Sequence, residues 1–364
     1  MSARSRRRPI LALLLFNAVV IVALDQIAGS REHVDLTASF RRRQADYHHD
    51  LRPSVRATMP WGARRVEVVT NSLAFRDETT REVSAARGDR PRILLLGDSF
   101  TEGVGVDWQE SFAGLLASEL AGEVEILNAG VIGYSPKIYA LKFAHLLDRV
   151  QLEVDELVVF IDMSDIPNEI IYATWEPGRP DVHPSPPPGF WARFRQRSLT
   201  LRALDQWRGV NLTDVAWNFH GMPFADDLDA VALSDPAFDD QEHWTLAWKY
   251  AQRGMEYATR HMDALASLCA DRGIPLTIVV YPWPANILAG ELDHPQVELW
   301  RSFSEERGVR FIDLFPVFIH DGYDPAETVA RYFIAGDVHW NAAGHERVAA
   351  HMAPLLAERA RSAE

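Results

Sequence analysis

The chain has 364 residues, of which 47% are hydrophobic, and its formal net charge is −14 at pH 7. This length is enough for a large core in one big domain or two small ones, and the negative charge argues against nucleic acid as a partner. The single cysteine, Cys269, excludes an internal disulfide, and its apolar helical surroundings indicate a buried, inert thiol. We expect no metal and no cofactor, because zinc-type Cys/His spacing and a phosphate-binding loop are both missing from the sequence.

The N-terminus combines a basic cluster with an apolar run. Four arginines precede apolar residues 10–24, namely Arg4, Arg6, Arg7 and Arg8. The run is shorter than the ~20 residues that a spanning helix prefers, so a cleaved signal peptide is the alternative. Because no small-x-small cleavage site follows Leu24 immediately, we favour an uncleaved signal anchor over residues 9–28 with a cytoplasmic tail at 1–8. The rest of the chain is then periplasmic.

Residues 29–90 are arginine-rich and weakly periodic, which predicts a stalk and lead-in with one short strand at 66–70. From residue 91 onward, apolar runs predict five strands, at 93–96, 124–128, 157–161, 276–280 and 310–314. Helices are expected between them: after Asp107, after Ser135, over about 243–271 and from Asn341 onward. This alternation predicts an α/β fold over 91–364, with a central parallel sheet of about five strands between helices.

One region interrupts the alternation. Residues 166–240 hold a proline-rich stretch at 184–188 and several tryptophans, with an amphipathic helix expected at 191–207. An insertion this long is typical of a functional cap or a mobile loop. Its tryptophans are suited either to stack on sugar rings or to pack a local core. They include Trp175, Trp191 and Trp217.

A serine comes after the first of these strands at a sharp turn. Gly97 permits the turn, and Ser99 then lies at the carboxyl edge of the sheet, where open α/β sheets bind ligands. Ser99 is either a nucleophile or a turn residue that caps the next element of the chain. Near the C-terminus, Asp337 and His339 are two residues apart, so in extended backbone both side chains project to one side.

A carboxylate beside a histidine fixes the tautomer of the ring and supports the imidazolium formed during proton transfer. Ser99, His339 and Asp337 are therefore a candidate catalytic triad. The alternative is that Asp337 or Asn341 caps the last helix and that His339 is a structural loop residue.

Three blocks in order along the chain resemble the motifs of the SGNH, or GDSL, hydrolase family: GDSFTEG at 97–103, NAGVIG at 128–133 and DVHWN at 337–341. The resemblance implies a flavodoxin-like three-layer sandwich in which Ser99 is the nucleophile, His339 the general base and Asp337 the residue that orients it. It also implies an oxyanion hole built from the backbone N–H groups of Ser99 and Gly133.

Three further features refine the resemblance. NSLAFRD at 71–77 is similar to the lead-in of membrane-anchored members, with Ala74 where a glycine is usual. Ser164 stands where the family carries an asparagine whose side chain donates to the oxyanion, and a serine hydroxyl donates one hydrogen bond with a shorter reach. The Asp-x-His spacing of the last block resembles the alginate-type O-acetyltransferase branch.

The leading interpretation is a serine esterase, or acyl hydrolase, acting outside the cytoplasm on acyl esters of envelope glycans or lipids. An O-acyltransferase acting on a polysaccharide with the same triad is one alternative, since both reactions share an acyl-enzyme. The other is a catalytically weak glycan-binding domain of the same fold, which the serine at position 164 motivates. The expected partners are a small-molecule or glycan ester and, through the N-terminal helix, the membrane.

Overall fold

A computed structural model describes most of the chain, namely residues 13, 15–28, 40–61, 64–173, 175–178, 194, 198–201 and 240–362. Its centre is a five-stranded parallel sheet with the strand order β6-β5-β7-β8-β9. The strands are β5 (Arg92–Leu96), β6 (Glu125–Asn128), β7 (Glu156–Ile161), β8 (Leu276–Val280) and β9 (Arg310–Asp313). This is the doubly wound order of flavodoxin-like sheets. The prediction of an α/β sandwich is confirmed, and each predicted strand of the sheet forms within one residue of its expected bounds.

The helices lie against this sheet and against one another. Within the described residues, α4 contacts α16, and α5 and α6 both contact α11. The helical segments are α3 (Ser99–Glu102), η1 (Trp108–Glu110), α4 (Phe112–Glu119), α5 (Pro136–His145), η2 (Leu146–Val150), α6 (Asp165–Ile171), α11 (Asp240–Arg272), α12 (Pro284–Ala289), α13 (Pro295–Arg307), α14 (Phe315–Phe318), α15 (Pro325–Tyr332) and α16 (Ala342–Ser362).

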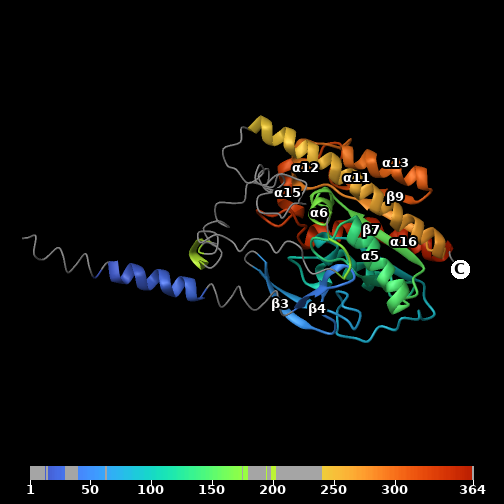
Figure 1. The fold of residues 1–364 in the computed structure, drawn as a ribbon, viewed down its shortest axis with the longest axis horizontal. Helices are drawn as coiled ribbons and strands as arrows, with labels where there is room; N and C mark the ends of the chain where they lie inside the picture. Colours follow the sequence, from blue (N-terminus) through green and yellow to red (C-terminus); the bar gives the residue numbers. More distant parts are fainter. Residues whose placement is uncertain are drawn as a thin grey trace, which may run out of the picture.

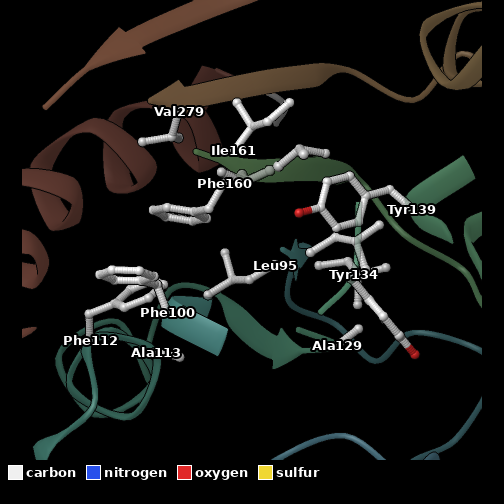
Figure 2. Close-up of a cluster of buried hydrophobic side chains, with 14 of the residues drawn as sticks. Leu95, Phe100, Phe112, Ala113, Ala129, Tyr134, Tyr139, Phe160, Ile161 and Val279 are labelled. Atoms are coloured by element: carbon white, nitrogen blue, oxygen red, sulfur yellow. The ribbon is translucent and has the colours of Figure 1, made fainter. Parts of the chain in front are cut away.

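Every residue of β5, β7 and β8 is buried, as expected for parallel strands covered on both faces, and this is why each of these strands is apolar apart from one residue, namely Arg92, Glu156 or Thr277. Figure 2 shows part of this core, in which side chains of β5, β7, α4 and α5 form one cluster. Cys269 is buried as predicted, and burial raises the pKa of its thiol to about 12.

The lead-in forms two antiparallel hairpins, β1 (Arg41–Gln44) with β2 (His48–Leu51) and β3 (Arg56–Trp61) with β4 (Arg64–Val69). Figure 1 shows β3 and β4 beside the sheet domain. Apolar side chains of this segment belong to the same core as the sheet, among them Phe40, Leu51 and Val68. The described part of the expected stalk is therefore packed onto the domain.

A buried ion pair also fixes the lead-in to a helix. Lys142 of α5 lies with its Nζ 2.9 Å from Oδ1 of Asp50 of β2, and both side chains are almost completely inaccessible to solvent. The ammonium group further contacts the carbonyl oxygen of Ala129 at 3.0 Å and the hydroxyl of Tyr134 at 3.2 Å. A charge pair this deep is tolerated only when its remaining hydrogen-bonding groups are satisfied.

The N-terminal apolar segment is helical over residues 15–28, with exposed apolar side chains that include Leu15, Phe16, Ile21 and Leu24. Across the ranges that the structure describes, no helix combines the length and the apolar character needed to cross a membrane. The tail expected at 1–8 lies outside these ranges, and the anchor expected at 9–28 lies partly outside them.

Most of the expected insertion also lies outside the described residues, including Trp191, Trp217 and most of the helix expected at 191–207. Trp175 is described and is only 7% exposed. Its ring lies 5.4 Å from that of His48, and its carbonyl oxygen accepts a 2.6 Å hydrogen bond from Lys137 Nζ. Trp175 therefore packs in the core, which favours the second of the two roles considered for it.

Candidate active site

Ser99 begins α3 immediately after β5, so the strand ends where a helix starts. Asp98 is the N-cap of this helix, and its carboxylate accepts a 3.0 Å hydrogen bond from the backbone N–H of Phe100. A Cβ atom at position 97 would lie 2.9 Å from the carbonyl oxygen of Phe160 in the neighbouring strand, so Gly97 is required for the close approach. This turn places Ser99 at the carboxyl edge of the sheet.

The loop between α15 and α16 brings the last sequence block to this serine. The Nε2 atom of His339 lies 2.8 Å from Ser99 Oγ, and its Nδ1 atom lies 2.6 Å from Asp337 Oδ1. Because a carboxylate only accepts, Nδ1 carries the hydrogen and the lone pair of Nε2 is free to accept the serine hydroxyl hydrogen. The structure thus brings together the three side chains proposed as a triad, across 240 residues of sequence between Ser99 and His339.

Of the two residues considered as caps for the last helix, Asn341 takes this role. Asn341 Oδ1 accepts a 3.1 Å hydrogen bond from the N–H of Gly344 at the start of α16. Asp337 instead faces His339. Burial alone would raise the pKa of the Asp337 carboxyl, but hydrogen bonds from His339 and Trp61 hold this pKa below its usual value. The carboxylate is therefore ionised at neutral pH, as an orienting group requires.

The second sequence block lies against the first. Asn128 Nδ2 donates to the carbonyl oxygen of Thr101 at 2.6 Å, and the N–H of Val131 donates to that of Gly97 at 3.1 Å. Gly133 is the last residue of this block and has φ of +77°, a conformation that favours glycine. Its carbonyl oxygen accepts a 2.7 Å hydrogen bond from the Tyr172 hydroxyl. The positive φ favours glycine at position 133 on conformational grounds, in addition to the space that glycine would leave for a substrate.

Ser164, expected as an oxyanion donor, lies between two buried carboxyl groups. Its Oγ atom is 3.1 Å from Asp98 Oδ2 and 2.6 Å from Asp162 Oδ1. A hydroxyl has one hydrogen, so it donates to only one of these oxygens, and the other contact is favourable only if that carboxyl carries a proton. Burial, followed by the charge of Asp162, raises the pKa of Asp98 to about 7, which agrees with a proton shared in this cluster.

Several buried groups near the site come from the lead-in and were not identified from the sequence. Arg76 is almost fully buried, and its guanidinium donates to four backbone carbonyl oxygens, those of Glu67, Glu102, Gly103 and Val106. Arg41 forms a two-bonded ion pair with the buried carboxylate of Glu102. No local pattern marks these contacts, because their partners lie between 9 and 61 residues away. Within the described residues, no three histidine, cysteine or acidic side chains are grouped to hold a metal ion.

Comparison with known proteins gives structural neighbours only. No family model matches the chain, and no curated protein matches it. A GDSL-like lipase from Bacteroides thetaiotaomicron is 12% identical with a TM-score of 0.38, over 76% of this chain and 93% of its own. A lipolytic protein of the G-D-S-L family from Veillonella parvula is 13% identical with a TM-score of 0.38, over 72% and 97%. A two-domain esterase active on acetylated mannans is 11% identical with a TM-score of 0.39, over 75% of this chain and 50% of its own.

These neighbours are lipases and esterases, and two of them are described as GDSL proteins, the family that the three sequence blocks resemble. Their identities of 11–13% and TM-scores of 0.38–0.39 assign no role to any residue of this chain. The chemistry of the site therefore rests on its own geometry.

Proposed function

We propose that the protein is a serine ester hydrolase of the SGNH type, with Ser99 as nucleophile, His339 as general base and Asp337 as the group that orients it. The observation that carries this proposal is the continuous chain of contacts from Ser99 Oγ to His339 Nε2 at 2.8 Å and from His339 Nδ1 to Asp337 Oδ1 at 2.6 Å. Both distances are within the range in which a positioned base takes a proton from a nucleophile.

The arrangement supports a two-step reaction. Ser99 Oγ attacks the ester carbonyl carbon while its proton passes to His339 Nε2, and the resulting imidazolium is stabilised by the Asp337 carboxylate. The carbonyl oxygen becomes an oxyanion, for which we propose the backbone N–H groups of Ser99 and Gly133 as donors. Ser99 is the first residue of its helix, so its N–H has no acceptor within the helix.

Collapse of this intermediate breaks the bond between the carbonyl carbon and the alkoxy oxygen, and His339 gives its proton to the departing alcohol. The acyl group is then an ester of Ser99. Water attacks this ester with His339 again as base, which releases the carboxylic acid and restores the serine hydroxyl.

Transfer of the acyl group to a hydroxyl of a polysaccharide is a second candidate reaction. It uses the same acyl-enzyme and differs only in the acceptor that attacks it. The spacing of Asp337 and His339, which resembles that of O-acetyltransferases, favours this candidate. A glycan-binding domain with weak catalysis is the non-enzymatic candidate, and Ser164 in place of the usual asparagine is the feature that favours it.

We propose that the substrate is an acyl ester of an envelope glycan or lipid. We also propose that the catalytic domain is anchored in the membrane and faces the periplasm. The basic cluster before residue 10 and the apolar helix at 15–28 support this placement. A reporter enzyme that works only outside the cytoplasm, fused after residue 364, should be active, and the protein should remain in the membrane fraction. A soluble mature chain that begins near Ser30 would instead identify a cleaved signal peptide.

The catalytic proposal is tested by mass spectrometry of the protein after treatment with a fluorophosphonate, which reacts with activated serines whatever the natural substrate. We expect one modified peptide, containing Ser99, and no modification of this peptide in His339→Ala. Ser111→Ala removes a helix-capping hydroxyl from α4 and should leave labelling unchanged. An unmodified Ser99 in the folded wild-type protein would favour the glycan-binding candidate.

A further inference from the structure

Trp61, the last residue of β3 in the lead-in, reaches the far side of the Asp337 carboxylate. Its indole Nε1–H donates a 2.7 Å hydrogen bond to Asp337 Oδ2, across 276 residues of sequence. The indole ring also lies 5.2 Å from the His339 ring, at an angle of 83° that presents an edge to a face. Trp61 therefore contacts both members of the acid–base pair from one side.

The two oxygens of Asp337 are consequently held from opposite directions. Oδ1 lies 2.6 Å from His339 Nδ1 and accepts a 3.2 Å hydrogen bond from the His339 backbone N–H, while Oδ2 accepts from Trp61. A carboxylate bound at only one oxygen rotates about its Cβ–Cγ bond. With donors on both oxygens its plane is fixed, and the imidazole that donates to it is fixed as well.

The neighbouring backbone leaves room for the indole. Gly105 adopts φ of +82°, and a Cβ atom there would lie 2.8 Å from Trp61 Cδ1. The hairpin itself is anchored, because the N–H of Glu67 donates to Asp107 Oδ1 at 2.7 Å and Arg76 Nη2 donates to the Glu67 carbonyl oxygen at 2.9 Å. The position of Trp61 is thus determined by contacts of its hairpin with the sheet domain.

We propose that Trp61 is a positioning residue for the Asp337–His339 pair, so that the lead-in hairpin completes the active site. The inference rests on the proposed triad and extends it. Trp61 touches neither the reacting serine nor a substrate in this role. It acts by keeping Asp337 Oδ1 directed at His339, which keeps the Nε2 lone pair directed at Ser99.

The test compares Trp61→Phe, which retains an aromatic ring but removes the donor, with Trp300→Phe, which makes the same change in the buried core of α13. Using a soluble acetyl ester as probe, we expect kcat of Trp61→Phe to fall about tenfold with KM within about twofold, as for loss of one hydrogen bond to a charged group. We expect Trp300→Phe to lower thermal stability and leave both constants unchanged.

A second measurement needs no substrate. A histidine Nδ1 hydrogen held by a carboxylate is expected at low field in the proton NMR spectrum, and His339→Gln identifies that signal by its loss. In Trp61→Phe this signal should broaden or disappear at 25 °C, whereas Trp300→Phe should retain it. If Trp61→Phe does not fold, Gly105→Ala provides the second variant, because it keeps the indole and fills the space in which it lies.

The two proposals fail in distinguishable ways. Wild-type protein that fails to react with a fluorophosphonate contradicts the triad, whatever the behaviour of residue 61. Wild-type protein that reacts, together with a Trp61→Phe variant that keeps kcat and a sharp low-field signal, would overturn the positioning role alone.

Discussion

Arg41 of the first hairpin and Glu102 of the first sequence block form an ion pair with two hydrogen bonds, of 3.0 and 2.7 Å. The Glu102 side chain is completely buried, and its Oε2 atom also accepts a 2.8 Å hydrogen bond from the N–H of Ile132. Glu102 therefore connects three parts of the site: the lead-in, the turn that carries Ser99 and the loop that carries Gly133.

Replacement of Arg41 should destabilise the fold strongly. Arg41→Ala leaves the Glu102 carboxylate buried without its cation, so we expect the free energy of unfolding to fall by about 3 kcal/mol. Arg56→Ala is the matched control, because Arg56 belongs to the second hairpin and pairs with Glu67 at the surface. Its effect should stay within about 0.5 kcal/mol in the same urea titration. Equal losses for the two variants would show that the Arg41 pair is not a structural connection.

Ala74 offers a stabilising substitution. It adopts φ of +64° and is almost fully buried, at the position where the resemblance to membrane-anchored proteins leads one to expect glycine. A side chain in this left-handed conformation costs roughly 1–2 kcal/mol, so Ala74→Gly should raise the free energy of unfolding by about 1 kcal/mol. Ala113→Gly, a buried position inside α4, should lower it by a similar amount. A loss in both variants would mean that the Ala74 methyl group stabilises more by packing than its backbone costs.

The central sheet and the candidate triad were predictable from the sequence because their signals are local. Nearly continuous apolar runs mark β5, β7 and β8, and the two blocks around Ser99 and His339 each keep a recognisable order of residues. The hairpins were predictable only in part, since the short strand expected at 66–70 corresponds to β4 at 64–69, whereas the other three strands were not expected. The strands RRRQ and HHDL contain almost no apolar residues, since they are held by pairing with each other and by ion pairs to the domain. A contact between residues as far apart in the sequence as Trp61 and Asp337 produces no local residue pattern from which it could be predicted.

Ser164 remains an expected donor to the oxyanion, and the kinetic constants of a Ser164 variant test that role. If its hydroxyl turns toward the oxyanion in the transition state, Ser164→Ala should lower kcat by about tenfold or more with little change in KM. Ser111→Ala is the control, since this N-cap serine should affect stability alone. Kinetic constants equal to those of the wild type would remove Ser164 from the oxyanion hole and leave it as the bridge between Asp98 and Asp162.

His345 should make the fold sensitive to acid. Its ring is buried and accepts a 3.2 Å hydrogen bond from the Phe112 N–H, and burial lowers its pKa from 6.5 to about 3. Because the folded pKa is the lower one, the unfolded chain binds more protons below pH 6.5, and this contribution to stability is lost as pH falls toward 3.

The measurement is the free energy of unfolding of wild type and His345→Gln at pH 7.5 and pH 5.5. The advantage of the wild type should be about 1.4 kcal/mol smaller at the lower pH, because only the wild type has to protonate this histidine on unfolding. An advantage that does not change with pH would show that the pKa of His345 is the same in the folded and the unfolded protein, so that burial does not lower it.

The most direct test of the proposed mechanism is a double-mutant cycle on kcat/KM for ester hydrolysis, with Ser99→Ala, His339→Ala and the combined variant. Residues that act as one unit give losses that do not multiply. Because His339 Nε2 lies 2.8 Å from Ser99 Oγ, we predict that each single variant loses nearly all activity and that the combined variant is barely worse than either. Asp337→Ala should cost less than either single variant. Single losses that multiply in the combined variant would contradict the triad, because Ser99 and His339 would then act independently.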